Sequence, residues 1–182
     1  MKIHSLSRKV LSLISMLTLL LASGCYIDFD DDDRNCVDGR GSFSTDVFDF
    51  SEFSRISNSL DAEIRITTGR SNHSVTVTAQ NNVVNEIEVR ARGSELILES
   101  DRCIDRGDVQ IDISLSELRG LFNAGSADIV GTNIWETDDL VLNLSGSGSI
   151  SAILEAIDLD VSIAGSGLIS LSGVCDDAQI SI

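Results

Sequence analysis

The sequence predicts an all-β fold, built as a β-solenoid, and three observations lead to that class. Apolar and polar residues alternate with a period of two through most of residues 61–182, which is typical of half-buried strands. Proline is absent, and Gly, Asn and Ser separate the alternating runs as turn residues do. A segment then recurs, because LVLNLSGSGSISA at 140–152 returns 19 residues later as LDVSIAGSGLISL at 159–171.

The N-terminus has the features of an export signal. Basic side chains precede an apolar stretch, residues 10–21, that is too short to span a bilayer comfortably. Ala22, Ser23, Gly24 and Cys25 follow. This order resembles a bacterial lipobox, whose cysteine is lipidated and becomes the new N-terminus. We therefore expect residues 1–24 to be a lipoprotein signal peptide, with an ordinary cleaved signal as the alternative.

Membrane attachment is expected through acyl chains on Cys25 alone. Tyr26 rather than Asp follows the cysteine, and by resemblance to enterobacterial sorting this favours the outer membrane of the cell envelope. Removal of residues 1–24 takes the formal net charge from −16 to about −19. So acidic a chain argues against nucleic acid as a partner, because nucleic-acid binding needs a basic surface.

A run of aspartates, Asp30–Asp33, follows the lipidation site. These carboxylates repel one another and have nothing apolar to pack on. We therefore expect residues 25–40 to be an acidic tether and residues 41–182 to form the domain. A calcium loop is the alternative, although the run lacks the spaced Asp and Gly of known calcium loops.

Three cysteines remain after Cys25, in a compartment that is oxidising. Cys36 and Cys103 flank the N-terminal part of the domain, and we expect them to form a disulfide. Cys175 takes the place that Ala156 has in the preceding repeat, which predicts a buried free thiol.

Short strands are predicted in order along the N-terminal half of the domain. Residues 61–69 alternate isoleucine with charged residues, and residues 74–80 alternate valine with threonine. Residues 85–100 supply two strands around a turn at Gly93, and residues 108–121 alternate aliphatic with polar side chains.

From about residue 118 the alternation becomes a repeat whose copies align on glycine. Leu142, Val161 and Ile180 are equivalent, and an earlier copy, offset by 21 residues, adds Leu121. Such a period is typical of solenoids, in which copies stack ~4.8 Å apart as parallel strands around one core. Corner glycines are expected to allow positive φ and close backbone approach, and they are Gly125, Gly146, Gly148, Gly165 and Gly167. An antiparallel stack of hairpins is the alternative.

Four stretches together resemble the DUF2807 family, the head GIN domain of auto-transporter adhesins. They are FSRISNSLDAEIRITTG from Phe53, SVTVTAQNNVVNEIEVRARGSELIL from Ser74, VQIDISLSELRGLFNAGSADI from Val109, and the Ser-Gly-Ser-Gly copies. The resemblance implies a right-handed parallel β-helix and no established catalytic site. The chain departs from the family at Ser116, where proline is usual.

Family members usually continue for further Gly-Ser-Gly coils, whereas Ile182 stands where the next corner belongs. We expect a shortened family member, or an apolar end that a partner or a second copy covers. End-to-end self-association is the expected consequence.

Asp139, Asp158 and Asp177 occupy the same place in successive copies. Turn chemistry is the simplest interpretation, since Asp accepts hydrogen bonds from nearby backbone N–H groups. The sharper alternatives are a carboxylate ladder for a divalent cation and a polysaccharide hydrolase or lyase with paired acids. Trp135 is the only tryptophan, so aromatic side chains for stacking sugars are few.

His73 is the only histidine after the signal, and we expect it in an exposed turn. Without a nucleophile elbow or a cofactor motif, we expect no catalytic residues and no cofactor. The preferred hypothesis is a non-enzymatic, lipid-anchored envelope protein that presents an acidic solenoid surface to a protein or glycan. An envelope carbohydrate-active enzyme and a periplasmic scaffold or sensor subunit are the alternatives.

Overall fold

The structure, a computed structural model, describes residues 36–105 and 107–182, and this part of the chain is all-β as predicted. The signal peptide, Cys25 and most of the tether lie outside the described residues. The N-terminal strands are β1 (Val37–Asp38), β2 (Phe43–Phe50), β3 (Arg55–Asn58), β4 (Glu63–Thr67), β5 (His73–Gln80), β6 (Ile87–Arg92), β7 (Glu95–Ser100) and β8 (Ile104–Asp105). The C-terminal strands are β9 (Gln110–Ser114), β10 (Gly120–Asn123), β11 (Asp128–Leu144), β12 (Ser149–Ile163) and β13 (Leu168–Ser181).

The described residues also form one short helix, α2 (Asn81–Val84). No helix in this part of the chain is long and apolar enough to cross a bilayer.

One sheet of 11 strands contains most of the domain, and it is mixed. Its order is β2-β5-β9-β4-β11-β10-β3-β7-β6, with β12 beside β11 and β13 beside β12. Three pairs are antiparallel, namely β2–β5, β5–β9 and β6–β7. The expectation of a uniformly parallel solenoid is therefore wrong for β2, β5 and β6. A two-residue turn at Gly93 joins β6 to β7, and so short a connection allows only antiparallel pairing.

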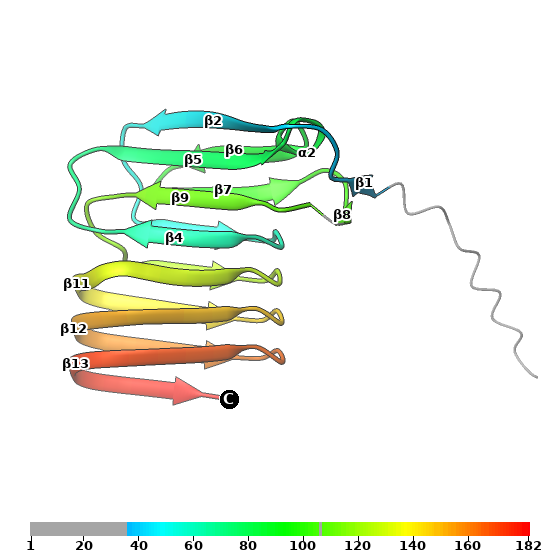
Figure 1. Cartoon of the computed structure of the whole chain (residues 1–182). Helices are drawn as coiled ribbons and strands as arrows, with labels where there is room; N and C mark the ends of the chain where they lie inside the picture. Colours follow the sequence, from blue (N-terminus) through cyan, green and yellow to red (C-terminus); the bar gives the residue numbers. More distant parts are fainter. Residues whose placement is uncertain (1–35, 106) are drawn as a thin grey trace, which may run out of the picture. The chain divides into compact units, whose positions relative to one another are not determined.

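The C-terminal strands stack in the order of the sequence repeats (Figure 1). β11 pairs in parallel with β12, and β12 with β13, so that Leu142, Val161 and Ile180 lie in one column. Each long strand crosses from one layer to the other, because the first half of β11 pairs with β4 and its second half with β10. Successive repeats are thus neighbouring rungs, whereas the hand of the coil stays a prediction.

A further rung lies above the repeats and is made by residues 65 positions earlier in the chain. β3 pairs in parallel with β10, which places Ile56 beside Leu121, and β4 pairs with β11, which places Ile64 beside Ile129. Asn58 and Asn123 occupy the buried corner of the two rungs, and Asn58 Nδ2 donates to Asn123 Oδ1 at 2.9 Å. Beyond this rung, β9 and β5 extend the layer of β4, and β7 and β6 extend the layer of β3 (Figure 1).

An irregularity in β11 explains why the first repeat is two residues longer than the next. The register between β11 and β12 shifts between Val130 and Ile134. Asn133 leaves the ladder there and bonds the backbone of Thr68, accepting from its N–H at 3.0 Å and donating to its C=O at 3.1 Å. Trp135 follows and is fully buried, packed over Gly131.

The N-terminal end of the core is closed. Val83 and Val84 of α2 are buried against the other core side chains. The expectation of an exposed His73 is wrong, because His73 is 8% exposed at the start of β5. Its ring packs edge-on against Phe53, 5.4 Å between centroids, and its Nε2 lies 3.2 Å from Ser116 Oγ.

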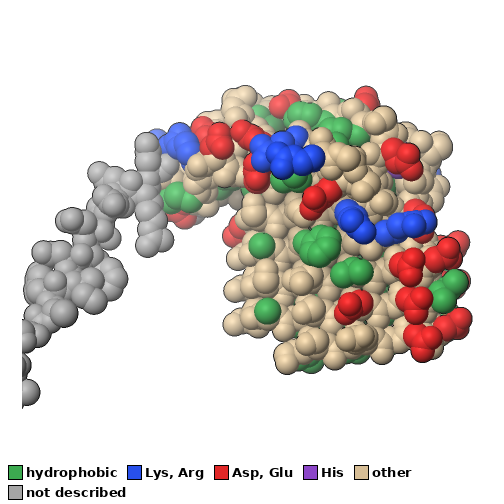
Figure 2. Space-filling view, turned by 180° about the vertical axis from the view of Figure 1, so that it is seen from behind, with side chains coloured by type: hydrophobic (Ala, Val, Ile, Leu, Met, Phe, Trp, Pro, Cys, Tyr) green, Lys and Arg blue, Asp and Glu red, His purple; other side chains and the backbone are tan. Residues whose placement is uncertain are grey.

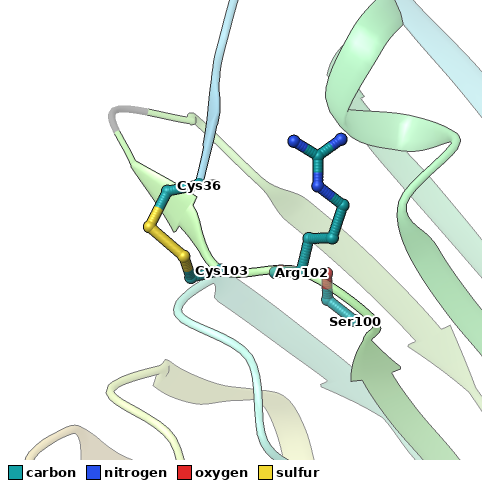
Figure 3. Close-up of a disulfide and its surroundings, with 4 residues drawn as sticks. All are labelled: Cys36, Ser100, Arg102 and Cys103. Atoms are coloured by element: carbon teal, nitrogen blue, oxygen red, sulfur yellow. Dashed lines mark hydrogen bonds between the residues drawn. A yellow bond between two sulfur atoms is a disulfide. The ribbon is translucent and has the colours of Figure 1, made fainter. Parts of the chain in front are cut away.

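The predicted disulfide between Cys36 and Cys103 is confirmed, and it fixes the start of the described chain (Figure 3). β1 pairs in parallel with β8 beside it, and Val37 N–H donates to Cys103 C=O at 2.8 Å. Val37 is buried. Residues 36–38 therefore contact the domain, although the sequence places them in the tether.

Candidate functional site

The corner glycines lie where consecutive rungs approach most closely. A Cβ on Gly146 would lie 1.8 Å from the carbonyl oxygen of Gly125, and one on Gly165 would lie 2.0 Å from that of Gly146. Gly148 and Gly167 form a second column, where a Cβ would lie 2.0 and 2.3 Å from the carbonyl oxygen of the rung above. The expectation of positive φ is wrong, since positive φ is found at Gly41, Gly69, Gly93 and Gly173 instead.

The three aspartates of the repeats form an exposed column on the outside of β11, β12 and β13. Asp139 pairs with Asp158, and Asp158 with Asp177, in parallel register. Neighbouring strands lie about 4.8 Å apart, so the carboxylates follow one another down the layer. A shallow depression of about 410 Å³ lies beside them and is also lined by Val141, Asp160 and Gln179.

The repeats that carry this column are acidic and contain no base. Residues 120–182 hold nine carboxylates and no Lys, Arg or His. All nine are exposed, and they are Asp128, Glu136, Asp138, Asp139, Glu155, Asp158, Asp160, Asp176 and Asp177. Figure 2 shows red side chains gathered on one side of the face, below a band of blue ones. Among the described residues, no cluster has the geometry to hold a metal ion.

Arg119 lies at the upper edge of the acidic column, where its C=O accepts from Val141 N–H at 3.0 Å. Its guanidinium donates to Glu117 at 3.0 Å, and Thr137 Oγ1 donates to the same carboxylate at 2.8 Å. Partial burial alone would raise the pKa of Glu117, but the bonds from Thr137 and Arg119 lower it. The pKa of Arg119 is raised by Glu117, with smaller effects from Asp138 and Asp139. No sequence pattern predicts this cluster, because its members lie on different strands and loops.

The C-terminal end of the core is open. An apolar groove of about 460 Å³ runs under β13, and its lining includes Leu154, Ile169, Leu171 and Ile180. The expectation of a buried Cys175 is wrong, because its thiol is free and exposed. The equivalent Ala156 is partly buried under β13, whereas β13 carries no strand on its other edge within the described chain.

The remaining groups named by the sequence do not assemble a reactive centre. Trp135 is fully buried and has no surface for stacking a sugar. His73 lies at the edge of the core, where its Nε2 is 3.2 Å from Ser116 Oγ. The chemistry that the described surface offers is therefore charge on the acidic face and apolar contact at the open end.

Comparisons with known proteins agree with this architecture. Three solved structures share the fold: a "putative adhesin" from Bacteroides fragilis at 23% identity and TM-score 0.73, a "putative lipid binding protein" from Parabacteroides distasonis at 19% and 0.74, and a "putative adhesin" from Parabacteroides merdae at 18% and 0.63. They match 78%, 79% and 78% of this chain, which in turn covers 67%, 64% and 70% of theirs. No curated protein matches.

A family model links these observations to a known group. The model described as "Putative auto-transporter adhesin, head GIN domain" matches residues 52–182, from the turn before β3 to the last residue. That range holds the closed end, every rung of the repeats and both glycine columns. The chain therefore belongs to the DUF2807 family of head GIN domains.

Proposed function

We propose that this protein is a non-enzymatic, lipid-anchored protein of the cell envelope that binds a partner through its acidic face. The observation that carries the proposal is the exposed column of Asp139, Asp158 and Asp177 in a segment without a single base. Membership of a family described by adhesion supports it. Because fold alone does not fix function, the residues of the face must be tested directly.

The face is suited to partners that carry basic groups. Exposed carboxylates attract cations over about 8–10 Å at physiological ionic strength. Parallel rungs in register hold the charges at fixed spacing, so the partner meets a rigid surface. We further propose that β10 to β13 wind as a right-handed parallel β-helix, because parallel crossover connections are right-handed in about 98% of cases.

Replacing the column by asparagine tests the proposal. We expect the triple variant Asp139→Asn, Asp158→Asn, Asp177→Asn to lose most binding to a panel of basic proteins and to basic or amine-bearing glycans on an array. Binding by the unchanged protein should weaken with salt. Unfolding measurements should show a fold at least as stable as before, because like charges have been removed.

A matched control removes the same charge elsewhere. Asp46, Asp49 and Asp61 are exposed and lie outside the column, so their replacement by asparagine should leave binding intact. Equal loss in both triple variants would contradict a specific face. Turnover of a glycan that the column variant abolishes would instead support the carbohydrate-active enzyme.

The anchor is tested separately. We expect the full chain to fractionate with outer membranes and to incorporate a labelled fatty acid, and Cys25→Ser to abolish both. Retention of Cys25→Ser in the membrane fraction would contradict attachment through this cysteine.

A further inference from the structure

The edge strand β13 leaves two kinds of group uncovered at the C-terminal end. One is its row of backbone N–H and C=O groups, which has no partner strand on that side within the described chain. The other is its inward side chains: Ile169 and Leu171 are only partly buried, and Ile180 is 65% exposed. Both kinds are satisfied at once by a further strand that follows the whole of β13.

The shape of β13 limits what can cover it. Like β11 and β12, it runs along one layer, turns and returns along the other (Figure 1). We call Leu168–Ser172 the first arm and Asp177–Ser181 the second arm. A straight edge strand covers one arm only, and the other edges of the described sheet, β2 and β6, are straight strands of eight and six residues. β2 and β6 also border the closed end of the core.

We propose that β13 of a second copy covers this end, in a closed two-fold dimer. A two-fold axis between the arms places the first arm of one copy over the second arm of the other. The first arm runs toward the turn and the second runs away from it, so the two are antiparallel. Such a contact is the same on both copies and closes after two subunits, whereas head-to-tail stacking would grow into a filament.

The side chains fit this arrangement in one register. When the five residues of each arm overlap fully, Leu171 lies opposite Ala178 of the second copy, and Ile169 lies opposite Ile180. Residues directly opposite in an antiparallel pair point to the same face, so both pairs point inward and close the apolar groove. A shift of one residue would place these aliphatic side chains against Asp177 and Gln179.

The charges also favour a two-fold dimer. The second arm carries Asp177, whereas the first arm, LISLS, has no charged residue. The axis exchanges the arms, so Asp177 lies opposite Ser172 of the second copy rather than another carboxylate. The remaining repulsion between two acidic copies is long-range, and added salt should therefore strengthen the dimer. With 14 residues in β13, fewer than the 20–30 a side of a standard interface, we expect a dissociation constant in the micromolar range.

Cysteine cross-linking in the full chain tests the register. In a Cys175→Ser background, we expect the double variant Leu171→Cys, Ala178→Cys to form a disulfide-linked dimer in intact cells treated with diamide, which accepts the two electrons and two protons of the thiol pair. Either single variant should stay monomeric, because its two thiols then lie on the same arm of each copy, and these arms are on opposite sides of the two-fold axis. Equal cross-linking of the singles and the double would overturn the register.

Sedimentation of the purified full chain tests the assembly. We expect a monomer–dimer equilibrium that shifts toward dimer with salt, and Ile180→Lys should shift it at least tenfold toward monomer. Ile180 is mostly exposed in one copy, so the thermal unfolding of the dilute variant should be unchanged. A strict monomer at high concentration, a monomer that retains a bound lipid, or a growing polymer would each overturn the proposal. The binding activity of the acidic face plays no part in either measurement.

Discussion

Gly146→Ala measures how much of the fold depends on the close contact between rungs. The new Cβ would lie 1.8 Å from the carbonyl oxygen of Gly125, whereas ordinary van der Waals contact begins at 3.4 Å, so the rungs must separate by more than 1 Å. Gly146 is also closely packed against the rung below, since a Cβ on Gly165 would lie 2.0 Å from the carbonyl oxygen of Gly146. The corner of this rung is therefore closely packed both above and below.

The expected loss in the free energy of unfolding follows from the contacts that must break. Separation breaks the bonds that Ser145 N–H and Gly146 N–H donate to Asn123 C=O, at 3.0 and 3.3 Å, at about 1 kcal/mol each. Residual overpacking adds about 1–3 kcal/mol. We expect unfolding to become easier by about 3–5 kcal/mol and Tm to fall by about 10 °C. Gly165→Ala should cost less, because the last rung can move away from the one above it.

The assay is urea unfolding followed by tryptophan fluorescence, because the single Trp135 is fully buried. Ser147→Ala is the matched control: it lies in the same turn, is exposed, and should change stability by less than about 0.5 kcal/mol. A Gly146→Ala protein as stable as this control would refute the argument from rung contact. A loss at Gly165 as large as at Gly146 would refute the argument from confinement.

Three further predictions concern other parts of the domain. Cys36→Ser with Cys103→Ser should lower the free energy of unfolding by about 4 kcal/mol, since the disulfide closes a loop with a separation of 67 residues; thermal unfolding with and without reductant measures this. Asn123→Ala should cost about 2–3 kcal/mol in urea unfolding, because it removes two buried hydrogen bonds, the one that Asn58 Nδ2 donates to Asn123 Oδ1 and the one that Asn123 Nδ2 donates to Ala127 C=O. The lowered pKa of Glu117 stabilises the fold above pH about 4.5, and this contribution is lost as pH falls through the folded pKa; Thr137→Val should therefore flatten the acid side of a stability–pH profile.

Several elements were readable from the sequence because their signals are local. Period-two alternation gave β4, β5, β6, β7 and β9 nearly at their observed bounds. The recurring Gly-Ser-Gly gave the rungs β11, β12 and β13 and the pairing of their aspartates. An alternating strand needs one buried face, and a 19-residue repeat needs each copy to stack on the last. Both patterns can therefore be recognised from residues that are close together in the sequence.

Other features were not predictable because they depend on residues distant in the chain. His73 looked like an exposed loop residue, but the ring of Phe53 and the hydroxyl of Ser116 bury it. Cys175 looked like a core residue by its place in the repeat, but no described strand lies over it. Burial is a property of neighbours, and a repeat position predicts it only for a rung that is covered on both sides.

What the sequence by itself determined is the all-β class, the family, the disulfide and the order of the repeating rungs. The tertiary structure alone decided that β3 and β4 form the rung above β10 and β11, although 65 residues separate them. It also decided the mixed sheet around β5 and the closed N-terminal end. The physical reason is that alternation fixes which face of a strand is apolar, whereas the identity of its neighbour depends on which distant strand offers a matching edge and side chains that fill the same core.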